Sequence, residues 1–166
     1  MADRKKRIGI IVGIVVALLL LCALYWQVNR FKLAPSLYED AEAMQGVTVQ
    51  VETDEESNKI TYVLQNHTTE EVDYDGIPAL EYRDGQSWQE VMTKLGNRRF
   101  DGGRTAIGYF IAPMSTVSGE VDLESLPRLK DGAYRLVFPG VWENDPVICS
   151  EPFQWGTQIT ENTTAY

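Results

Sequence analysis

The feature that most constrains this chain is a run of uncharged residues near its N-terminus. Residues Ile8 to Trp26 read IGIIVGIVVALLLLCALYW. A helix of this length spans about 28 Å, which is close to the hydrocarbon thickness of a bilayer. The run is apolar around its whole circumference, whereas a helix on the surface of a soluble domain has a polar stripe. The sequence therefore predicts one transmembrane helix over residues 8–26, with membrane lipid as its partner.

The charges on either side of this run predict its orientation. A basic cluster from Arg4 to Arg7 precedes it, and only Arg30 and Lys32 follow closely. Basic residues are retained on the cytoplasmic side of a membrane, so residues 1–7 are predicted to be a cytoplasmic tail. The protein is then expected in the cell membrane as a single-pass protein with its C-terminal domain outside the cell.

Two alternatives to an uncleaved helix are cleavage as a signal peptide and lipid attachment, and both depend on the C-terminal half of this segment. Cleavage of a signal peptide requires small residues in an A-x-A-like arrangement, and residues 22–26 offer no such pair. Lipid attachment at Cys22 is the second alternative, but the bacterial lipoprotein signal has a small residue before its cysteine and Leu21 stands there. An uncleaved signal anchor is the preferred interpretation, and both alternatives stay open.

Charge is divided unevenly between the two parts of the chain. Residues 1–32 contain six basic residues and one acidic residue, whereas residues 33–166 contain nine basic and 23 acidic residues, a formal net charge of -14. A domain this acidic repels the phosphates of nucleic acids, so DNA and RNA are not expected among its partners. The charge fits a solvated surface near a wall or membrane, or a basic partner.

The segment after the apolar run is predicted to be a stalk over residues 27–45. Pro35 cannot continue the membrane helix. Ser36 and Glu39 have the spacing of a capping box, which predicts a short helix that ends at Met44. The folded domain is expected over residues 46–157, followed by a flexible tail over residues 158–166.

From Gly46 onward the apolar residues alternate with polar ones, as in β-strands that are buried on one face. Polar turn clusters separate the strands, and Asp84-Gly85 is the strongest hairpin signal in the chain. About seven to nine short strands with almost no helix predict an all-β fold, an immunoglobulin-like antiparallel β-sandwich. The predicted strands cover residues 47–52, 60–66, 72–74, 79–83, 88–91, 105–112, 116–123, 133–138 and 147–155.

Three pieces of this region follow one another in an order that a known family shares. They are the polar turn at 66–72, the hairpin from Leu80 to Trp88, and the segment Leu129-Lys130-Asp131-Gly132-Ala133-Tyr134-Arg135. In these pieces the chain resembles the bacterial immunoglobulin-like domain of membrane-anchored surface proteins and lipoproteins of Gram-positive bacteria. The resemblance implies a sandwich fold at the cell surface, and a scaffold without shared catalytic residues.

The last of these pieces also has a physical reason. Tyr134 follows the turn residue Gly132 and enters a late core strand. In that place its ring can fold over the corner and its hydroxyl can bond the backbone, as in the tyrosine corner of such sandwiches. We therefore expect Tyr134 to join the core at the start of that strand.

Histidine is scarce in this chain and carboxylates are plentiful, but neither residue type forms a recognisable catalytic or metal-binding pattern. His67 is the only histidine, so a site with several histidines is impossible, and His67 is predicted to be a solvated turn residue. The segment Asp73-Tyr74-Asp75-Gly76 lacks the further ligands of a calcium loop. No catalytic, cofactor-binding or metal-binding residue is assigned, no cofactor is expected, and the chain is not expected to be an enzyme.

The two cysteines are not expected to pair, because Cys22 lies in the predicted membrane helix and Cys149 in the last strand. Cys149 is predicted to be a small buried residue in a sandwich held together by packing. Aromatic residues are predicted to fill the core, with an exposed sugar-binding platform as the sharper alternative; they are Trp88, Trp142, Trp155, Tyr62, Tyr82 and Tyr109.

These observations favour a membrane-anchored extracellular module with a non-catalytic binding or structural role, whose partner is an unknown protein or a wall component. Two alternatives stay open. One is a small extracytoplasmic hydrolase with paired carboxylates, which would meet only in the fold. The other is an accessory subunit of a membrane complex, in which Gly9 and Gly13 would pack against another helix.

Overall fold

The protein is described by a computed structural model, which covers residues 2–98, 108–141 and 146–156, with the helix side chains described from Gly13 onward. The chain divides into two compact units, 1–30 and 31–166. Trp142 and the predicted tail at 158–166 lie outside the described residues.

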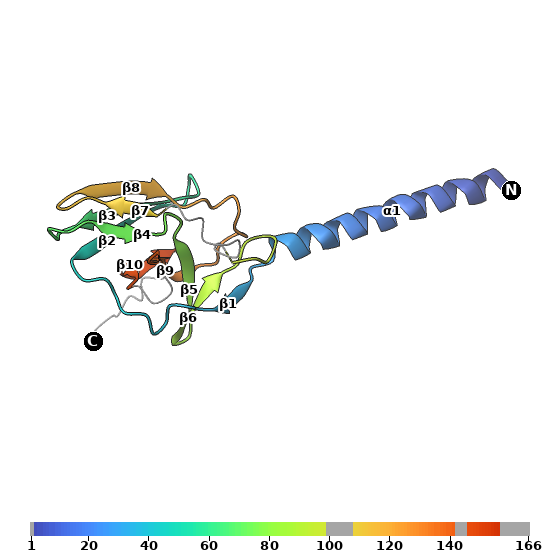
Figure 1. The fold of residues 1–166 in the computed structure, drawn as a ribbon. Helices are drawn as coiled ribbons and strands as arrows, with labels where there is room; N and C mark the ends of the chain where they lie inside the picture. Colours follow the sequence, from blue (N-terminus) through green and yellow to red (C-terminus); the bar gives the residue numbers. More distant parts are fainter. Residues whose placement is uncertain (1, 99–107, 142–145, 157–166) are drawn as a thin grey trace, which may run out of the picture. The chain divides into compact units, whose positions relative to one another are not determined.

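The first unit is a single helix. Helix α1 covers Ala2–Asn29, so it is longer than the predicted run at both ends (Figure 1). The predicted N-terminal helix is therefore present. Among the residues whose side chains are described, no helix is long and apolar enough to cross a membrane.

The segment after α1 differs from the predicted stalk. Strand β1, Leu33–Pro35, begins only three residues after α1 ends, and residues 36–45 contain no helix. The prediction of a short helix from Ser36 was wrong because the chain finds extended partners. The hydroxyl of Ser36 bonds the Glu81 carboxylate instead of capping a helix, and the backbone N–H of Met44 donates to the Val147 carbonyl at 2.8 Å.

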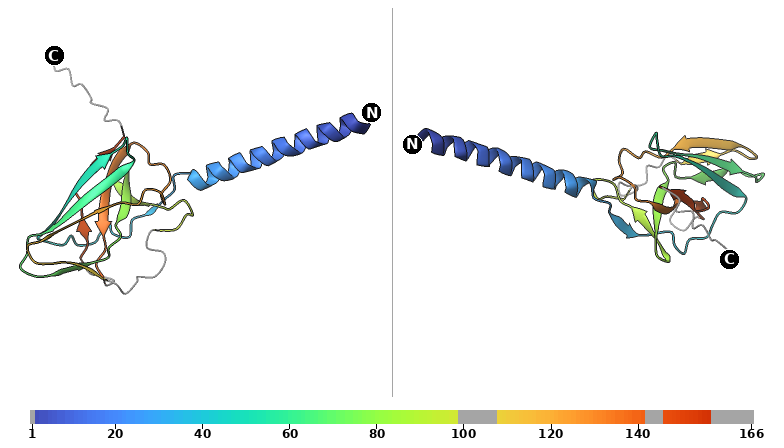
Figure 2. Two further views of the ribbon diagram at one scale, coloured as in Figure 1. Left: turned by 90° about the horizontal axis from the view of Figure 1, so that it is seen from above. Right: turned by 180° about the vertical axis from the view of Figure 1, so that it is seen from behind.

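Two antiparallel sheets and a short ribbon form the second unit, and Figure 2 shows them in two further views. The first sheet has the order β1-β6-β5-β9-β10, and β11 also pairs with β9. Its further strands are β5 Ala79–Asp84, β6 Ser87–Val91, β9 Gly132–Phe138, β10 Ile148–Cys149 and β11 Phe153–Trp155.

The second sheet has the order β2-β3-β8, and strands β4 and β7 form the separate two-stranded ribbon. These strands are β2 Val47–Asp54, β3 Lys59–Asn66, β4 Val72–Tyr74, β7 Tyr109–Ile111 and β8 Thr116–Glu120. The orders β2-β3-β8 and β6-β5-β9-β10 correspond to the ABE and C′CFG sheets of an immunoglobulin-like sandwich. The mostly antiparallel β fold is thus consistent with the predicted class.

Most predicted strands are confirmed, with changes at three places. The strand predicted over 105–112 is described only from residue 108, and its β part is β7. The strand predicted over 116–123 ends at Glu120 as β8. The strand predicted over 147–155 is divided into β10 and β11, because Pro152 between them has no N–H for a ladder.

The tight hairpin turn predicted at Asp84-Gly85 is present, with its two loop residues one position further along the chain. Asp84 in β5 pairs with Ser87 in β6, which leaves Gly85 and Gln86 as the loop. Gly85 has a φ of 65°, a left-handed conformation that glycine adopts without a Cβ clash.

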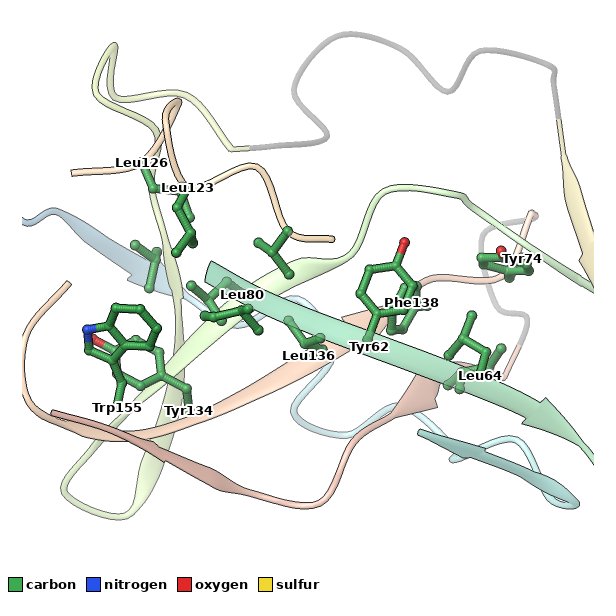
Figure 3. Packing of buried hydrophobic residues seen from close by; sticks show 14 of the residues in the cluster. Tyr62, Leu64, Tyr74, Leu80, Leu123, Leu126, Tyr134, Leu136, Phe138 and Trp155 are labelled. Carbon is green, nitrogen blue, oxygen red and sulfur yellow. The ribbon is translucent and has the colours of Figure 1, made fainter. Parts of the chain in front are cut away.

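The core lies between the two sheets and extends along β9 (Figure 3). At the start of this strand the ring centroids of Tyr134 and Tyr82 are 5.2 Å apart, and those of Tyr82 and Phe31 are 5.5 Å apart. At its end Phe138 lies 5.9 Å from Tyr74. The sandwich therefore has one end where the chain enters at Phe31 and an opposite end at Tyr74.

The tyrosine corner is confirmed. Tyr134 is fully buried, and its hydroxyl donates to the Lys130 carbonyl at 2.8 Å. The same hydroxyl oxygen accepts a hydrogen bond from the Lys130 N–H at 3.1 Å. Burial raises the pKa of this hydroxyl above its ordinary value. The loop from β8 to β9 is thus fixed to the core by one side chain.

Replacing Tyr134 by phenylalanine is expected to lower the free energy of unfolding by about 1–2 kcal/mol, because the partly buried Lys130 carbonyl and N–H both lose their partner. Urea unfolding followed by circular dichroism measures the loss. Tyr109→Phe is the matched control, since this ring is more than half exposed, and it should change stability by less than about 0.5 kcal/mol. Equal losses in the two variants would contradict the corner's role.

Candidate functional site

Two buried glutamates face each other on neighbouring strands of the first sheet. Glu81 in β5 pairs with Glu90 in β6, and their exposed fractions are 0% and 1%. Their strand neighbours Leu80 and Val91 point into the core. Because side chains alternate along a strand, both carboxylates lie on the outer face of the sheet. The fold thus brings together two carboxylates, as the hydrolase alternative requires.

The Glu81 carboxylate is neutralised by an arginine from the adjacent strand β9. Nε and Nη2 of Arg135 lie 2.8 Å and 2.7 Å from Oε2 of Glu81. The Ser36 hydroxyl donates to Oε1, so both carboxylate oxygens have partners. The Arg135 guanidinium also lies 4.6 Å from the centre of the Trp88 ring, which covers it from the outside.

The Glu90 carboxylate is paired with Arg98, which follows β6 in the chain. Nη1 of Arg98 donates to Oε2 of Glu90, and its Nη2 donates to the Pro35 carbonyl at 2.9 Å. Arg98 therefore joins the glutamate to the end of β1. Together the two ion pairs help to hold the segment Pro35–Ser36 at the edge of the sheet, beside β6.

This arrangement supports a structural role rather than hydrolysis. A glycosidase needs one carboxylic acid that can give up a proton and one carboxylate that can reach substrate or water. Here both carboxylates are covered and each is bound to a guanidinium. The sequence analysis missed this cluster, because Glu81 and Arg135 are 54 positions apart and meet only through strand pairing.

The other residues considered for chemistry lie apart from this cluster. His67 is exposed in the turn after β3, with Nε2 3.0 Å from Oγ1 of Thr48, as predicted for a solvated turn residue. Asp73 is exposed in β4. Among the described residues, no group of three or more His, Cys, Asp or Glu side chains is placed to hold a metal ion.

An open, polar hollow of about 410 Å³ lies beside the β2–β3 turn. Its charged lining residues are Lys59, Glu120, Asp122 and Glu124. Lys59 pairs with Glu120 at 3.3 Å, and the Asp122 carboxylate accepts the Glu124 N–H at 3.0 Å. Two of these three carboxylates thus have local structural bonds.

Cys149 is half-buried and packs on the outer face of the first sheet beside Val137 and Val147. Burial raises the pKa of its thiol, which keeps the group protonated at neutral pH. Cys149 and Cys22 are both free. The thiol therefore serves packing, although its side chain is half-buried and not fully buried as the sequence predicted.

The aromatic residues do not form one common platform. Tyr62 and Trp155 are buried and Tyr82 and Trp88 are half-buried, whereas Trp142 lies outside the described residues. Tyr109 alone of the predicted set is more than half exposed in the described part of the chain. Its neighbour Phe110, which the sequence analysis did not single out, is 59% exposed.

Asn66 ties the β4–β7 ribbon to the second sheet. It is 1% exposed at the end of β3. Its side-chain amide nitrogen donates to the carbonyls of Glu70, Ile111 and Ala112 at 2.8, 3.1 and 3.2 Å. Its side-chain oxygen accepts from the N–H and the hydroxyl of Thr68. One buried amide therefore fixes the turn after β3 and the end of β7.

The stability of the domain is expected to fall at alkaline pH because of Tyr74. Its ring is 3% exposed, and burial raises the pKa of its hydroxyl to about 12. An unfolded chain releases this proton near pH 10, so the stabilisation is complete below about pH 10 and is lost as the pH rises through about 12. The urea concentration at the midpoint of unfolding should stay level up to about pH 10 and decline above it.

Tyr74→Phe removes this titration while it keeps the ring. The variant should show a shallower decline above about pH 10, since the buried hydroxyl of Tyr134 still contributes in the same direction. An unchanged decline in the variant would mean that other groups cause the alkaline loss.

The strand order of the two sheets and the tyrosine corner together define an immunoglobulin-like β-sandwich. A comparison with known families matches residues 43–139, more than half of the chain, to the bacterial Ig-like domain. The chain therefore belongs to the bacterial Ig-like domain family, as the sequence resemblance indicated. Searches of curated proteins and of solved structures find no match.

Proposed function

We propose that this chain is a membrane-anchored, non-catalytic module that displays a bacterial Ig-like domain outside the cell and binds or positions a partner there. The observation that carries the proposal is the direct connection of this domain to α1, whose residues 8–26 contain no charge. The basic residues Arg4–Arg7 support a cytoplasmic N-terminus.

The exposed surface of α1 supports a lipid environment. Ten large apolar or aromatic side chains between Ile14 and Trp26 are at least 48% exposed. A continuous apolar surface of this kind is costly in water and is favourable against lipid chains. Tyr25 and Trp26 stand at the end of the run, where aromatic rings favour the membrane interface.

The Ig-like domain itself supports a binding or structural role. The family is a scaffold, and the buried glutamates are bound to Arg135 and Arg98. The domain follows α1 without a long stalk, because only residues 30–32 separate α1 from β1. The two ion pairs at Pro35–Ser36 then hold the entering chain to the sheet. Such a construction suits a domain that is held firmly at the point where its chain enters.

Membrane fractionation of the full-length protein with a C-terminal tag tests the anchor. The tagged chain should stay in the membrane pellet after alkaline carbonate, keep its full mass, and lose the tag to protease added to intact cells. Leu19→Arg with Leu20→Arg should release it, since each arginine at a helix centre costs about 2.5–3.5 kcal/mol on insertion. Leu95→Arg, at a position 83% exposed in the domain, is the control and should stay in the membrane.

Cys22→Ala separates a helix anchor from a lipid anchor. We expect the variant to keep the mass and the membrane location of the wild type apart from the substitution itself. A shorter chain in the medium, or release of the Cys22→Ala variant, would refute the uncleaved helix anchor.

A further inference from the structure

The turn after β6 holds a leucine side chain out in solvent. Leu95 is 83% exposed, more than any other large apolar side chain described in the domain. The Thr93 N–H donates to the Asn97 carbonyl at 2.9 Å, and the Gly96 N–H donates to the Thr93 carbonyl at 2.8 Å. Gly96 has a φ of 83°, a left-handed conformation that glycine adopts readily. Because these bonds fix the backbone of the turn, Leu95 is held on its outside.

This turn is bonded to the chain where it enters the domain. The Met92 N–H donates to the Lys32 carbonyl at 3.0 Å, and Nζ of Lys32 donates to the Lys94 carbonyl at 3.4 Å. The Lys94 N–H donates to the Ser125 carbonyl at 2.9 Å. The turn is thus fixed both to the entering chain and to the loop between β8 and β9.

Three lysines gather at this end of the domain. Besides Lys32, Nζ of Lys94 donates to the Glu124 backbone carbonyl at 2.8 Å, and Nζ of Lys130 lies 4.8 Å from the centre of the Phe31 ring. The ion pairs found in the described part of the chain use other cations. An ammonium group has three donors, so a lysine bonded to one carbonyl keeps donors for an anionic ligand.

Positive charge is concentrated here relative to the rest of the domain. The three segments that build this end contain four basic and three acidic residues, whereas residues 33–166 as a whole contain nine and 23. One of the three carboxylates, that of Asp122, accepts backbone N–H groups of its own loop. The segments are 31–32, 92–97 and 122–131. We call Leu95 together with Lys32, Lys94 and Lys130 the entry surface.

Chain connectivity brings the proposed membrane within reach of the entry surface. Five residues, 27–31, separate the uncharged run from Lys32, and even fully extended they span at most about 18 Å. The headgroup layer is about 5–7 Å thick on each side of a bilayer. With residues 8–26 across the bilayer, Lys32 therefore stays close to the headgroups.

We propose that the entry surface binds the headgroups of an anionic membrane, with the three lysines on the lipid phosphates and Leu95 in the interface. A single exposed leucine is ordinary on a protein surface. A leucine fixed beside three lysines has the combination by which peripheral segments bind anionic lipid, namely apolar burial together with electrostatic attraction. The inference rests on the proposed anchor and adds that the domain itself contacts lipid.

The test uses the full-length protein reconstituted in vesicles of phosphatidylcholine, either alone or mixed in equal parts with phosphatidylglycerol. A fluorophore on Asn97→Cys, in a background of Cys22→Ala with Cys149→Ala, reports quenching by nitroxide-labelled headgroups. Asn97 is exposed in the same turn and lies outside the four residues of the entry surface. The label should be quenched in the mixed vesicles and much less in phosphatidylcholine alone, and added salt should reduce the quenching.

Two variants separate the contributions of charge and of the apolar side chain. Lys94→Gln with Lys130→Gln should lower the ratio of docked to undocked domain, taken from the quenched fraction, by about tenfold or more, since each basic residue near an anionic surface contributes about fivefold. Leu95→Ser should lower this ratio by about threefold or more. It leaves α1 intact, so the chain should still float with the vesicles.

Matched controls lie elsewhere on the domain. Lys59→Gln with Arg83→Gln makes the same change in charge at exposed positions and should stay within about twofold of the wild type. The same label on Phe110→Cys, at an exposed position of β7, should escape quenching in both kinds of vesicle. Unchanged unfolding midpoints show that the variants are folded.

The failure of this inference differs from a failure of the anchor. A chain that does not float with the vesicles refutes the anchor and this inference with it. A chain that floats while the Asn97 label stays unquenched refutes the inference alone. Equal quenching in both lipid mixtures, or equal losses in the lysine variant and its control, would overturn the binding of anionic headgroups by these lysines.

Discussion

Replacing Arg135 by methionine is expected to lower the free energy of unfolding by about 3–5 kcal/mol, which approaches the whole stability of many domains. The variant leaves the Glu81 carboxylate, 0% exposed, without the guanidinium that lies 2.7–2.8 Å away. A buried charge without a partner cannot recover the hydration that it lost on folding. Urea unfolding at neutral pH, followed by circular dichroism, measures the loss.

Two further variants test the cause. Lys59→Met breaks the ion pair with Glu120, whose two side chains are 52% and 50% exposed, and should cost less than about 1 kcal/mol. Glu81→Leu combined with Arg135→Met removes both buried charges and should restore most of the stability that Arg135→Met loses. A small loss in Arg135→Met, or no recovery in the double variant, would show that Glu81 does not depend on Arg135.

The strands could be predicted because alternation is a local property. In β3 the sequence places Ile60, Tyr62 and Leu64 on one face, and these side chains are 0%, 8% and 0% exposed. A strand needs no knowledge of its partner to have an apolar face. The tyrosine corner was predictable for the same reason, because Tyr134 bonds a residue only four positions before it.

The Glu81–Glu90 cluster could not be predicted, because it depends on which strands pair and in which register. Glu81 stands next to two apolar neighbours, and sequence alone would place it on the solvated face of β5. Register brings it beside Arg135 in β9 and opposite Glu90 in β6. The chain between β1 and β2 then covers the face from which solvent would reach it, beginning with Ser36.

The region after α1 shows how tertiary partners override a local signal. Ser36 and Glu39 have the spacing of a capping box, but a short helix is marginal without a face to bury. The backbone there pairs instead with the chain around β10, where Ala43 forms a parallel bridge with Val147. The exposure of Phe110 was missed for a different reason, since it depends on how two short strands end a sandwich.

Replacing Asn66 by alanine is expected to lower the free energy of unfolding by about 2–4 kcal/mol. The substitution removes the donors for the carbonyls of Glu70, Ile111 and Ala112, and it removes the acceptor for Thr68. The buried polar groups lose hydrogen bonds that alanine cannot replace. Each lost bond costs about 1–3 kcal/mol, and the cost is smaller where water can bond the freed group. Urea unfolding measures the total effect.

Hydrogen exchange tests whether the loss is local to the ribbon. In Asn66→Ala the N–H of Thr68 and that of Met114, which donates to the Thr68 carbonyl, should exchange faster than the amides of β5 and β9. Gln65→Ala, at the half-buried neighbour of Asn66, should cost less than about 1 kcal/mol and leave this contrast unchanged. Retained ribbon protection in Asn66→Ala would show that strand pairing alone holds Tyr109 and Phe110 in place.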